Sequence, residues 1–262
     1  MLRRIATLGI ALISVCNAMA QTATDGFSMK KGEICLVAGY GQSSWDEYWE
    51  GKLLRGNPNI GTFKAKMIMP MLGYGLSDRL NLFASLPNIS TSSTAGTMTG
   101  MKGWQDFALD AKYKLIKKPG KAGTFYTFVT AGFSFPASNY VPDHLPFSIG
   151  LGAKTASARV IAHYEHKSHL FATIQTGYVL RSNITTDRQS YYNDGQVNSN
   201  EMPVPDVWDG AARIGFNNKR VRIDAHFNWM RSTSGSDIRW NDMPYPFNRM
   251  NAQWVGVQGL LW

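Results

Sequence analysis

The sequence predicts an all-β protein: a closed antiparallel transmembrane β-barrel of about ten strands, with twelve strands as the alternative. Three observations support this fold class. Apolar residues alternate with polar or charged residues in one segment after another, short and long connections follow each other strictly, and the chain opens on a typical export signal.

Residues 1–20 have the features of a cleaved signal. Two arginines begin the segment, and the apolar stretch over residues 5–15 is too short to span a bilayer. Ala18-Met19-Ala20 matches a cleavage site with small residues at its ends. We therefore expect residues 21–32 to be a short periplasmic segment and residues 33–262 to form the barrel. A soluble protein with an apolar N-terminal helix is the alternative.

The composition excludes several classes of protein. The formal net charge is +9, and loss of the two signal arginines lowers it to about +7. No basic run is interleaved with aromatic residues, so we expect no nucleic-acid partner. Removal of Cys16 with the signal leaves only Cys35, which cannot form an internal disulfide. After the signal, no stretch reaches the 18 apolar residues expected of a transmembrane helix.

The stretch "DFALDAKYKL" illustrates the strand pattern. Its even positions from Asp106 to Lys114 are charged or small, and its odd positions are Phe107, Leu109, Ala111, Tyr113 and Leu115. A period of two indicates a strand with an apolar and a polar face. Similar patterns predict strands at residues 33–47, 60–76, 79–88, 104–116, 123–136, 147–165, 169–184, 203–217, 219–232 and 251–262.

The connections between these strands alternate in length. Short turns include Ser77-Asp78, "KKPGKAG" and Asn217-Asn218, whereas the intervening loops are long and polar. Short periplasmic turns opposite long extracellular loops are typical of outer-membrane barrels, and they place both chain ends on the short-turn side. A soluble antiparallel sandwich is the alternative, but it gives no reason for this separation.

The last strand, "AQWVGVQGLLW", ends on Trp262. A terminal aromatic residue is usual in the closing strand of outer-membrane barrels. We therefore expect the barrel-assembly machinery to be a partner that recognises this strand, and outer-membrane lipid to surround the protein.

Three stretches resemble a known family. "GEICLVAGYGQSSWDEYWEG", "YGLSDRLNLFASLPNIS" and "GWQDFALDAKYKL" are similar to bacterial outer-membrane proteins named for the meta-pathway of phenol degradation. The resemblance covers roughly residues 32–115, although Gly103-Trp104-Gln105-Asp106 departs from the family's usual glycine beside the aspartate. The resemblance implies a channel that admits aromatic or other hydrophobic compounds. It implies no catalytic or binding residues.

Alternation predicts a polar network inside the barrel. A barrel of about ten strands is nearly filled by side chains, so these charges are expected to pair. They could form a rigid plug, or they could line a narrow path or gate. The predicted lumen-facing residues are Lys64, Lys66, Asp106, Asp110, Lys112, Asp209, Arg213, Arg222, Asp224 and His226. Met67, Met69 and Met71 share the other face of their strand and are expected to contact lipid.

Aromatic residues near the strand ends fit an interfacial girdle. In the last long loop, Trp240, Tyr245 and Phe247 could instead line an outer vestibule for an apolar solute. The histidines of the "HYEHKSH" stretch could serve as metal ligands. Strand alternation, however, places His163 and His166 on opposite faces, so we expect neither metal nor cofactor. No nucleophile signature occurs, and we expect no enzyme.

The predicted function is passive passage of small, hydrophobic or aromatic compounds across the bacterial outer membrane. The alternative is a non-transporting structural or surface-interaction barrel with a plugged lumen.

Overall fold

The chain folds almost entirely into β-strands. The computed structural model describes residues 9–14, 21–193, 195–240 and 242–261. The described residues form strands, turns and loops without a helix, which confirms the all-β prediction. Within that part of the chain there is accordingly no helix of the length and apolarity needed to cross a membrane. The expectation for Trp262 and most of the expected signal lie outside the described residues.

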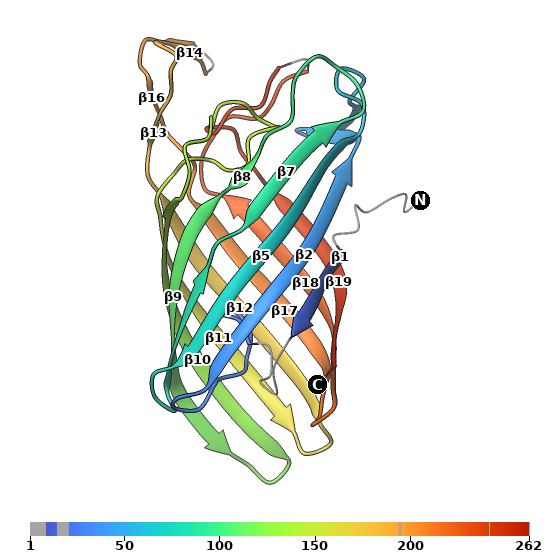
Figure 1. Cartoon of the computed structure of the whole chain (residues 1–262), viewed down its shortest axis with the longest axis vertical. Helices are drawn as coiled ribbons and strands as arrows, with labels where there is room; N and C mark the ends of the chain where they lie inside the picture. The colour runs from blue at the N-terminus through green and yellow to red at the C-terminus, as the bar shows by residue number, and fades with distance from the viewer. Residues whose placement is uncertain (1–8, 15–20, 194, 241, 262) are drawn as a thin grey trace.

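One antiparallel sheet contains all the long strands. Its order is β1-β2-β5-β6-β9-β10-β11-β12-β17-β18-β19, with β7 pairing with β5 and β8 (Figure 1). The strands are β1 (Gly9–Ser14), β2 (Ile34–Trp45), β5 (Phe63–Gly75), β6 (Leu80–Ser85), β7 (Asn88–Ser93), β8 (Lys102–Trp104), β9 (Asp106–Pro119), β10 (Gly123–Pro136), β11 (Thr155–His166), β12 (Leu170–Arg181), β17 (Val207–Asn217), β18 (Val221–Ser232) and β19 (Ala252–Leu261).

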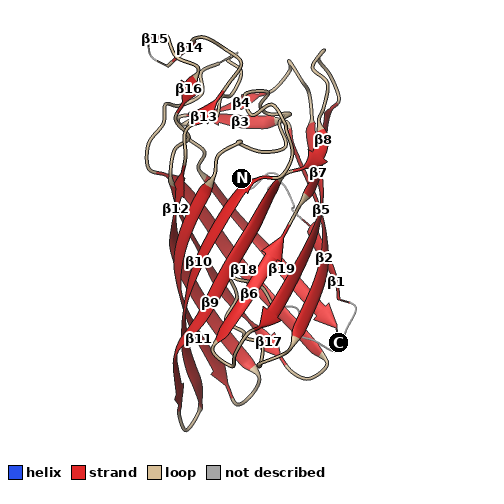
Figure 2. Ribbon diagram, turned by 60° about the vertical axis from the view of Figure 1, so that its left-hand side comes forward, coloured by secondary structure: helices blue, strands red, loops and turns tan. Residues whose placement is uncertain are grey.

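The sheet curls about a long axis, so that β17 and β18 lie behind β2 and β5 (Figures 1 and 2). Its hydrogen-bonded order runs from β1 to β19. β1 pairs with β2, with Gly9 opposite Gln42, and it also lies beside β19. β1 therefore occupies the seam between the two ends of the sheet, although it belongs to the expected signal.

Two of the strands are interrupted by short breaks. β6 and β7 are separated by Leu86-Pro87, and β8 and β9 are separated by Gln105. The pairing continues across both breaks, because the Gln105 amide donates to the Pro87 carbonyl at 2.8 Å. Each of the ten predicted segments overlaps a strand of this sheet, with β1 aside. The predictions at 79–88 and 104–116 were too short, because β7 and β8 extend these strands into residues 90–103, which the sequence predicted as a loop.

Alternation gives the sheet a concave and a convex face of opposite character. On β9, Lys112 is only 1% exposed on the concave face, whereas Leu109 and Tyr113 are exposed on the convex face. β18 repeats this pattern, with Arg222 and Asp224 buried and Ile223 exposed. On these two strands, apolar side chains therefore lie on the convex face and charged side chains on the concave face.

β5 reverses the predicted faces. Phe63 and Met71 are buried on its concave face together with the half-buried Met67 and Met69, whereas Lys64 and Lys66 are exposed on the convex face. The prediction that these lysines face the lumen and the methionines face lipid is therefore wrong. The concave face of β5 is apolar because two segments outside the strands, residues 21–29 and 137–154, pack against it. Phe63, for example, contacts the ring of Phe147 with centroids 5.7 Å apart.

The long loops gather at one end of the sheet, and the short turns lie at the other (Figure 2). The loops carry small hairpins that the sequence did not predict: β3 (Glu47–Glu50) with β4 (Leu53–Gly56), β13 (Ile184–Thr185) with β16 (Glu201–Met202), and β14 (Tyr191–Tyr192) with β15 (Gln196–Val197). Residues 147–154, expected to begin a strand, instead belong to a loop.

The two faces can be tested at β11. Ile161 is fully buried on the concave face, whereas its neighbour Val160 is exposed on the convex face. Ile161→Ala should lower the free energy of unfolding by about 3 kcal/mol, because it removes buried contacts and leaves a cavity. The control Val160→Ala should cost less than about 1 kcal/mol. Urea unfolding under one set of conditions measures both, and equal losses of unfolding free energy would contradict the assignment of faces.

Candidate functional site

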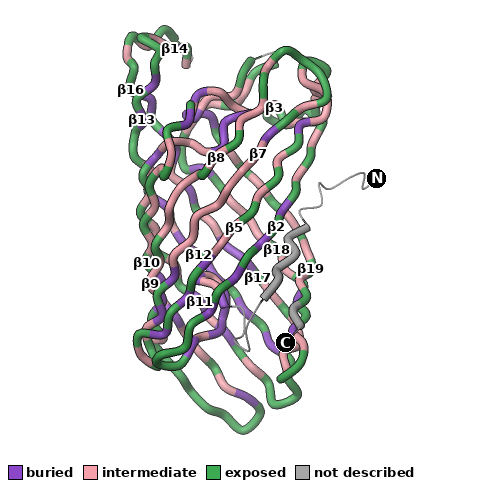
Figure 3. The backbone as a smooth tube through the Cα atoms, viewed as in Figure 1, coloured by how far each residue is buried: buried purple, intermediate pink, exposed green. Residues whose placement is uncertain are grey.

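Residues 21–29, here called the inserted segment, lie inside the curled sheet. Alternate residues of the segment, Gln21, Ala23, Asp25, Phe27 and Met29, are buried. Side chains from β6, β9, β11, β12 and β18 contact it. Strands this far apart in the sheet can meet one segment only within its curvature, near the short turns (Figures 1 and 3). The sequence instead placed this segment in the periplasm.

A buried ion pair anchors the inserted segment to the strands of the large sheet, here called the wall. Lys112 Nζ lies 2.8 Å from Asp25 Oδ1, and it also donates to the carbonyls of Thr22 and Phe27 at 3.0 and 2.5 Å. Asp25 Oδ2 lies 3.7 Å from Arg222 Nη1 on β18. Each ammonium proton of Lys112 therefore has an acceptor on the segment, as a buried cation requires.

The same contacts keep Asp25 ionised. Burial alone raises the pKa of a carboxyl group, but Lys112 and Arg222 outweigh it and hold the pKa of Asp25 below its ordinary value of 3.8. The backbone amides of Thr22 and Phe27 also donate to this carboxylate, at 2.8 and 3.0 Å. The anion therefore shapes the segment itself as well as attaching it to the wall.

Phe27 fills an aromatic and cationic pocket beside the ion pair. The Arg222 guanidinium lies 4.2 Å from the centre of the Phe27 ring, a cation–π contact. The rings of His163 and Phe171 contact Phe27 with centroid distances of 4.8 and 5.3 Å. Arg222 thus joins the acidic and the aromatic anchor of the segment.

Two further positions fix the path of the segment. The Met29 amide donates to Asn81 Oδ1 at 2.9 Å, and Asn81 Nδ2 donates back to the Met29 carbonyl at 3.1 Å. Gly26 packs so closely on His163 that a Cβ atom would lie 2.1 Å from Nδ1 of the imidazole. A residue with any side chain at position 26 would therefore displace the segment or the histidine.

Between the two ends, the concave face carries an ion pair. Arg159 on β11 holds Asp209 on β17, with Nη2 and Oδ2 2.5 Å apart and Nε and Oδ1 3.0 Å apart. Arg159 Nη1 also donates to Ser157 at 3.0 Å. Such a bidentate pair fixes both side chains against the wall.

A second segment, residues 137–154, packs against the sheet at the end with the long loops. Phe147 is 0% exposed, and its carbonyl accepts from Thr91 Oγ1 of β7 at 2.6 Å. Tyr140 donates to Asp106 of β9 at 2.6 Å and accepts from the Gly152 amide at 3.1 Å. Burial, together with the Asp106 carboxylate, raises the pKa of Tyr140 and keeps it a donor.

The predicted lumen residues divide into two groups. Lys64 and Lys66 lie on the convex face, as described above. The other eight belong to the concave-face register of their strands: Asp106, Asp110, Lys112, Asp209, Arg213, Arg222, Asp224 and His226. Sequence reasoning missed the inserted segment and its Asp25, although the alternation of residues 21–29 could have indicated an extended, half-buried stretch.

The three predicted vestibule residues do not form one surface. Trp240 is 58% exposed, with the Arg55 guanidinium 5.8 Å from its ring. Tyr245 and Phe247 stack with centroids 5.4 Å apart, but Phe247 is buried against Tyr191 in an apolar cluster of the loops. Only Trp240 and part of Tyr245 could therefore meet a solute.

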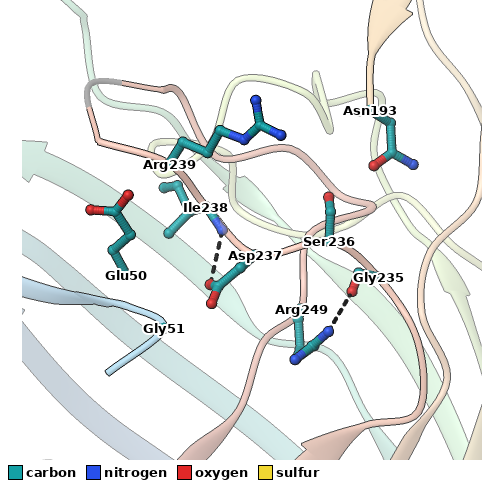
Figure 4. Close-up of a pocket in the computed structure, with 9 residues that line it drawn as sticks. All are labelled: Glu50, Gly51, Asn193, Gly235, Ser236, Asp237, Ile238, Arg239 and Arg249. Carbon is teal, nitrogen blue, oxygen red and sulfur yellow. Dashed lines mark hydrogen bonds between the residues drawn. The ribbon is translucent and has the colours of Figure 1, made fainter. Parts of the chain in front are cut away.

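A cavity of about 670 Å³ opens among the same loops (Figure 4). It is lined by residues of both charges, including Glu50, Asp237, Arg239 and Arg249. Arg249 Nη2 donates to the Gly235 carbonyl at 3.1 Å, and Glu50 is held by Arg55 at 2.7 Å. The hydrogen bond from Arg55 lowers the pKa of Glu50. The lining combines charged side chains of both signs with the apolar Ile238.

No protein-family model matches this chain, and no curated protein matches it at a significant level. Within the described part of the chain, no three His, Cys, Asp or Glu side chains gather as a metal site.

The ion pair between Asp25 and Lys112 should control the docking of the inserted segment. Asp25→Asn leaves a buried ammonium without its counterion, which should lower the hydrogen-exchange protection of residues 21–29 by about 100-fold or more. Lys112→Met should act similarly. The double variant should lose less protection than the two single variants combined, because neither charge then remains buried without a partner.

Asp187→Asn, at an exposed loop carboxylate, is the matched control and should leave the protection unchanged. If Asp25→Asn behaved like this control, the ion pair would not hold the segment.

Proposed function

We propose that this protein is an outer-membrane β-barrel through which small apolar or aromatic compounds pass passively, with the inserted segment as its gate. One observation carries the membrane location: the sheet has its polarity inverted relative to a soluble protein. Leu36, Ile174, Ile214 and Val257 are among the large apolar side chains exposed on its convex face, whereas Lys112 and Asp224 are buried. An apolar exterior of this kind fits lipid as its solvent.

We propose further that the sheet closes when the signal is removed. Cleavage after residue 20 would remove β1 and leave the edges of β2 and β19 facing each other. Unpaired backbone groups at a sheet edge cost several kcal/mol each in lipid, so these edges would pair. The mature barrel would then have ten strands, or twelve if the two parts of each interrupted strand are counted separately.

Passage would require movement of the segments that close the two ends. Both closures are chain segments laid against the wall, whereas the wall itself is a continuous ladder of strands. A few side-chain contacts hold the inserted segment, so it could leave without unpairing any strand. The concave charges would then line a narrow path of mixed sign.

The nature of the solute is supported by two features of the chain. Trp240 and Tyr245 offer aromatic surface at the loop end. The resemblance of residues 32–115 to the outer-membrane family of phenol degradation points to the same class of compound. Aromatic or other hydrophobic molecules are therefore the solutes to test first.

A structural or surface-interaction barrel is the competing function. It is favoured by the filling of both ends, since Phe147 and Asp25 are both fully buried. In that case the inserted segment would stiffen the wall permanently and no solute would pass.

The first prediction concerns the membrane barrel. The mature chain, residues 21–262, should require detergent and should migrate faster on gels before boiling than after it, because a closed barrel resists unfolding by detergent alone. Deletion of β19 should abolish the fast form, because two strand edges would then lack partners. A mature chain that stays monodisperse without detergent and migrates identically in both conditions would sink the membrane proposal.

The second prediction concerns the gate. Gly26→Val should displace the inserted segment from His163 and raise single-channel conductance in planar bilayers, together with uptake of phenols into liposomes. Gly56→Val is the matched control, because a Cβ at position 56 meets open space. Unchanged conductance in a Gly26→Val protein that retains the heat-modifiable form would favour the structural barrel.

A further inference from the structure

The convex face of the sheet carries a compact group of lysines at the end with the long loops. Lys64 and Lys66 lie on β5 and Lys102 lies on β8, with β7 between them. All three are exposed, and within the described residues none of them forms an ion pair with a carboxylate. They are here called the lysine patch.

Strand register brings two of these lysines to the same height. Lys66 is opposite Ser90, and Ser90 is opposite Lys102, so the three residues form one row across β5, β7 and β8. Two strand spacings place the backbones of the two lysines roughly 10 Å apart, and Lys64 follows about 7 Å further along β5. Flexible four-carbon side chains can converge over such distances on one anion. The small hydroxyl of Ser90 leaves room between them and supplies a further donor.

The row below marks the edge of the apolar belt. Tyr40 is opposite Ile68, Ile68 is opposite Asn88, and Asn88 is opposite Trp104. Tyr40, Ile68 and Trp104 are exposed on the convex face. Aromatic residues prefer the boundary between hydrocarbon and headgroups. The lysine patch, one row nearer the loops, would therefore stand at the level of the lipid headgroups.

The neighbouring strands differ in chemistry on the same side. Phe107 of β9 and Phe135 of β10 pair with ring centroids 5.7 Å apart where the convex face continues beyond β8. Beyond β5, in the other direction, the patch is continued by the uncharged Gln42 and Ser44 of β2. Exposed cations also occur elsewhere at this end, as Arg231 of β18 does opposite Trp208, but the three lysines lie together on adjacent strands, which gives them the character of a site.

We propose that Lys64, Lys66 and Lys102, with Ser90, bind the phosphate groups of a phosphorylated glycolipid in the outer leaflet. This inference rests on the proposed membrane location, and it adds a specific lipid site to it. Several ammonium groups with no protein counterion, held at headgroup height, are complementary to a headgroup with more than one phosphate.

Binding can be measured with the refolded mature protein in neutral detergent micelles. Bisphosphorylated lipid A is titrated and bound lipid is counted by native mass spectrometry. The triple variant K64Q/K66Q/K102Q should bind on the order of 100-fold more weakly than the wild type. Each lysine near a charged lipid strengthens binding by roughly fivefold, and the variant removes three of them. The dephosphorylated glycolipid should bind equally weakly to both proteins, and phosphatidylglycerol should bind the wild type more weakly than lipid A does.

The matched control is K117Q/K118Q/K121Q, which removes the same charge from exposed lysines at the short-turn end. It should bind lipid A as the wild type does. Equal binding by the wild type and the patch variant, or equal losses in the two triple variants, would overturn the site. The heat-modifiable form reports separately on the barrel: a protein that has this form but shows no preference for lipid A refutes only the lipid site.

Discussion

The interior of this protein is organised by the need to pair one buried ammonium group. Lys112 points from β9 into a space closed to water, where an unpaired cation would cost several kcal/mol. Its acceptors all come from a segment that precedes the first long strand, namely the Asp25 carboxylate and two carbonyls. Without the inserted segment, the buried Lys112 ammonium of the wall would therefore lack its hydrogen-bond acceptors and its counterion.

Arg222 extends this dependence across the interior. It faces Asp25 at 3.7 Å and Asp224 of its own strand at 3.3 Å, and it also covers the Phe27 ring. One guanidinium thus couples the charge balance of the wall to the apolar packing of the segment. At the loop end the second segment is held differently, by the apolar packing of Phe147 and by hydroxyl donors such as Thr91 and Tyr140, without a buried ion pair of the Lys112 kind among the described residues.

Much of the fold could be predicted because strands with two unlike faces show a period of two in the sequence. β9 is the clear case, with Lys112 and Leu109 on the faces that alternation assigns. The prediction of the faces of β5 was wrong because other chain segments cover the concave face of this strand. Met67 and Met69 therefore pack on the concave face, and Lys64 lies on the convex face. Asp25 was missed because its partners are distant in sequence, and no local pattern records a contact of that kind.

The inserted segment is attached to the wall in an unusual way for a protein made of strands. Within the described residues, the backbone of residues 21–29 is held by side chains, those of Asn81, Lys112 and Asp25, and joins no strand ladder. Release of this segment therefore requires no strand pairing to be broken. Substitutions in this handful of side chains are therefore expected to change how firmly the segment is held while the strand pairing of the surrounding sheet stays the same.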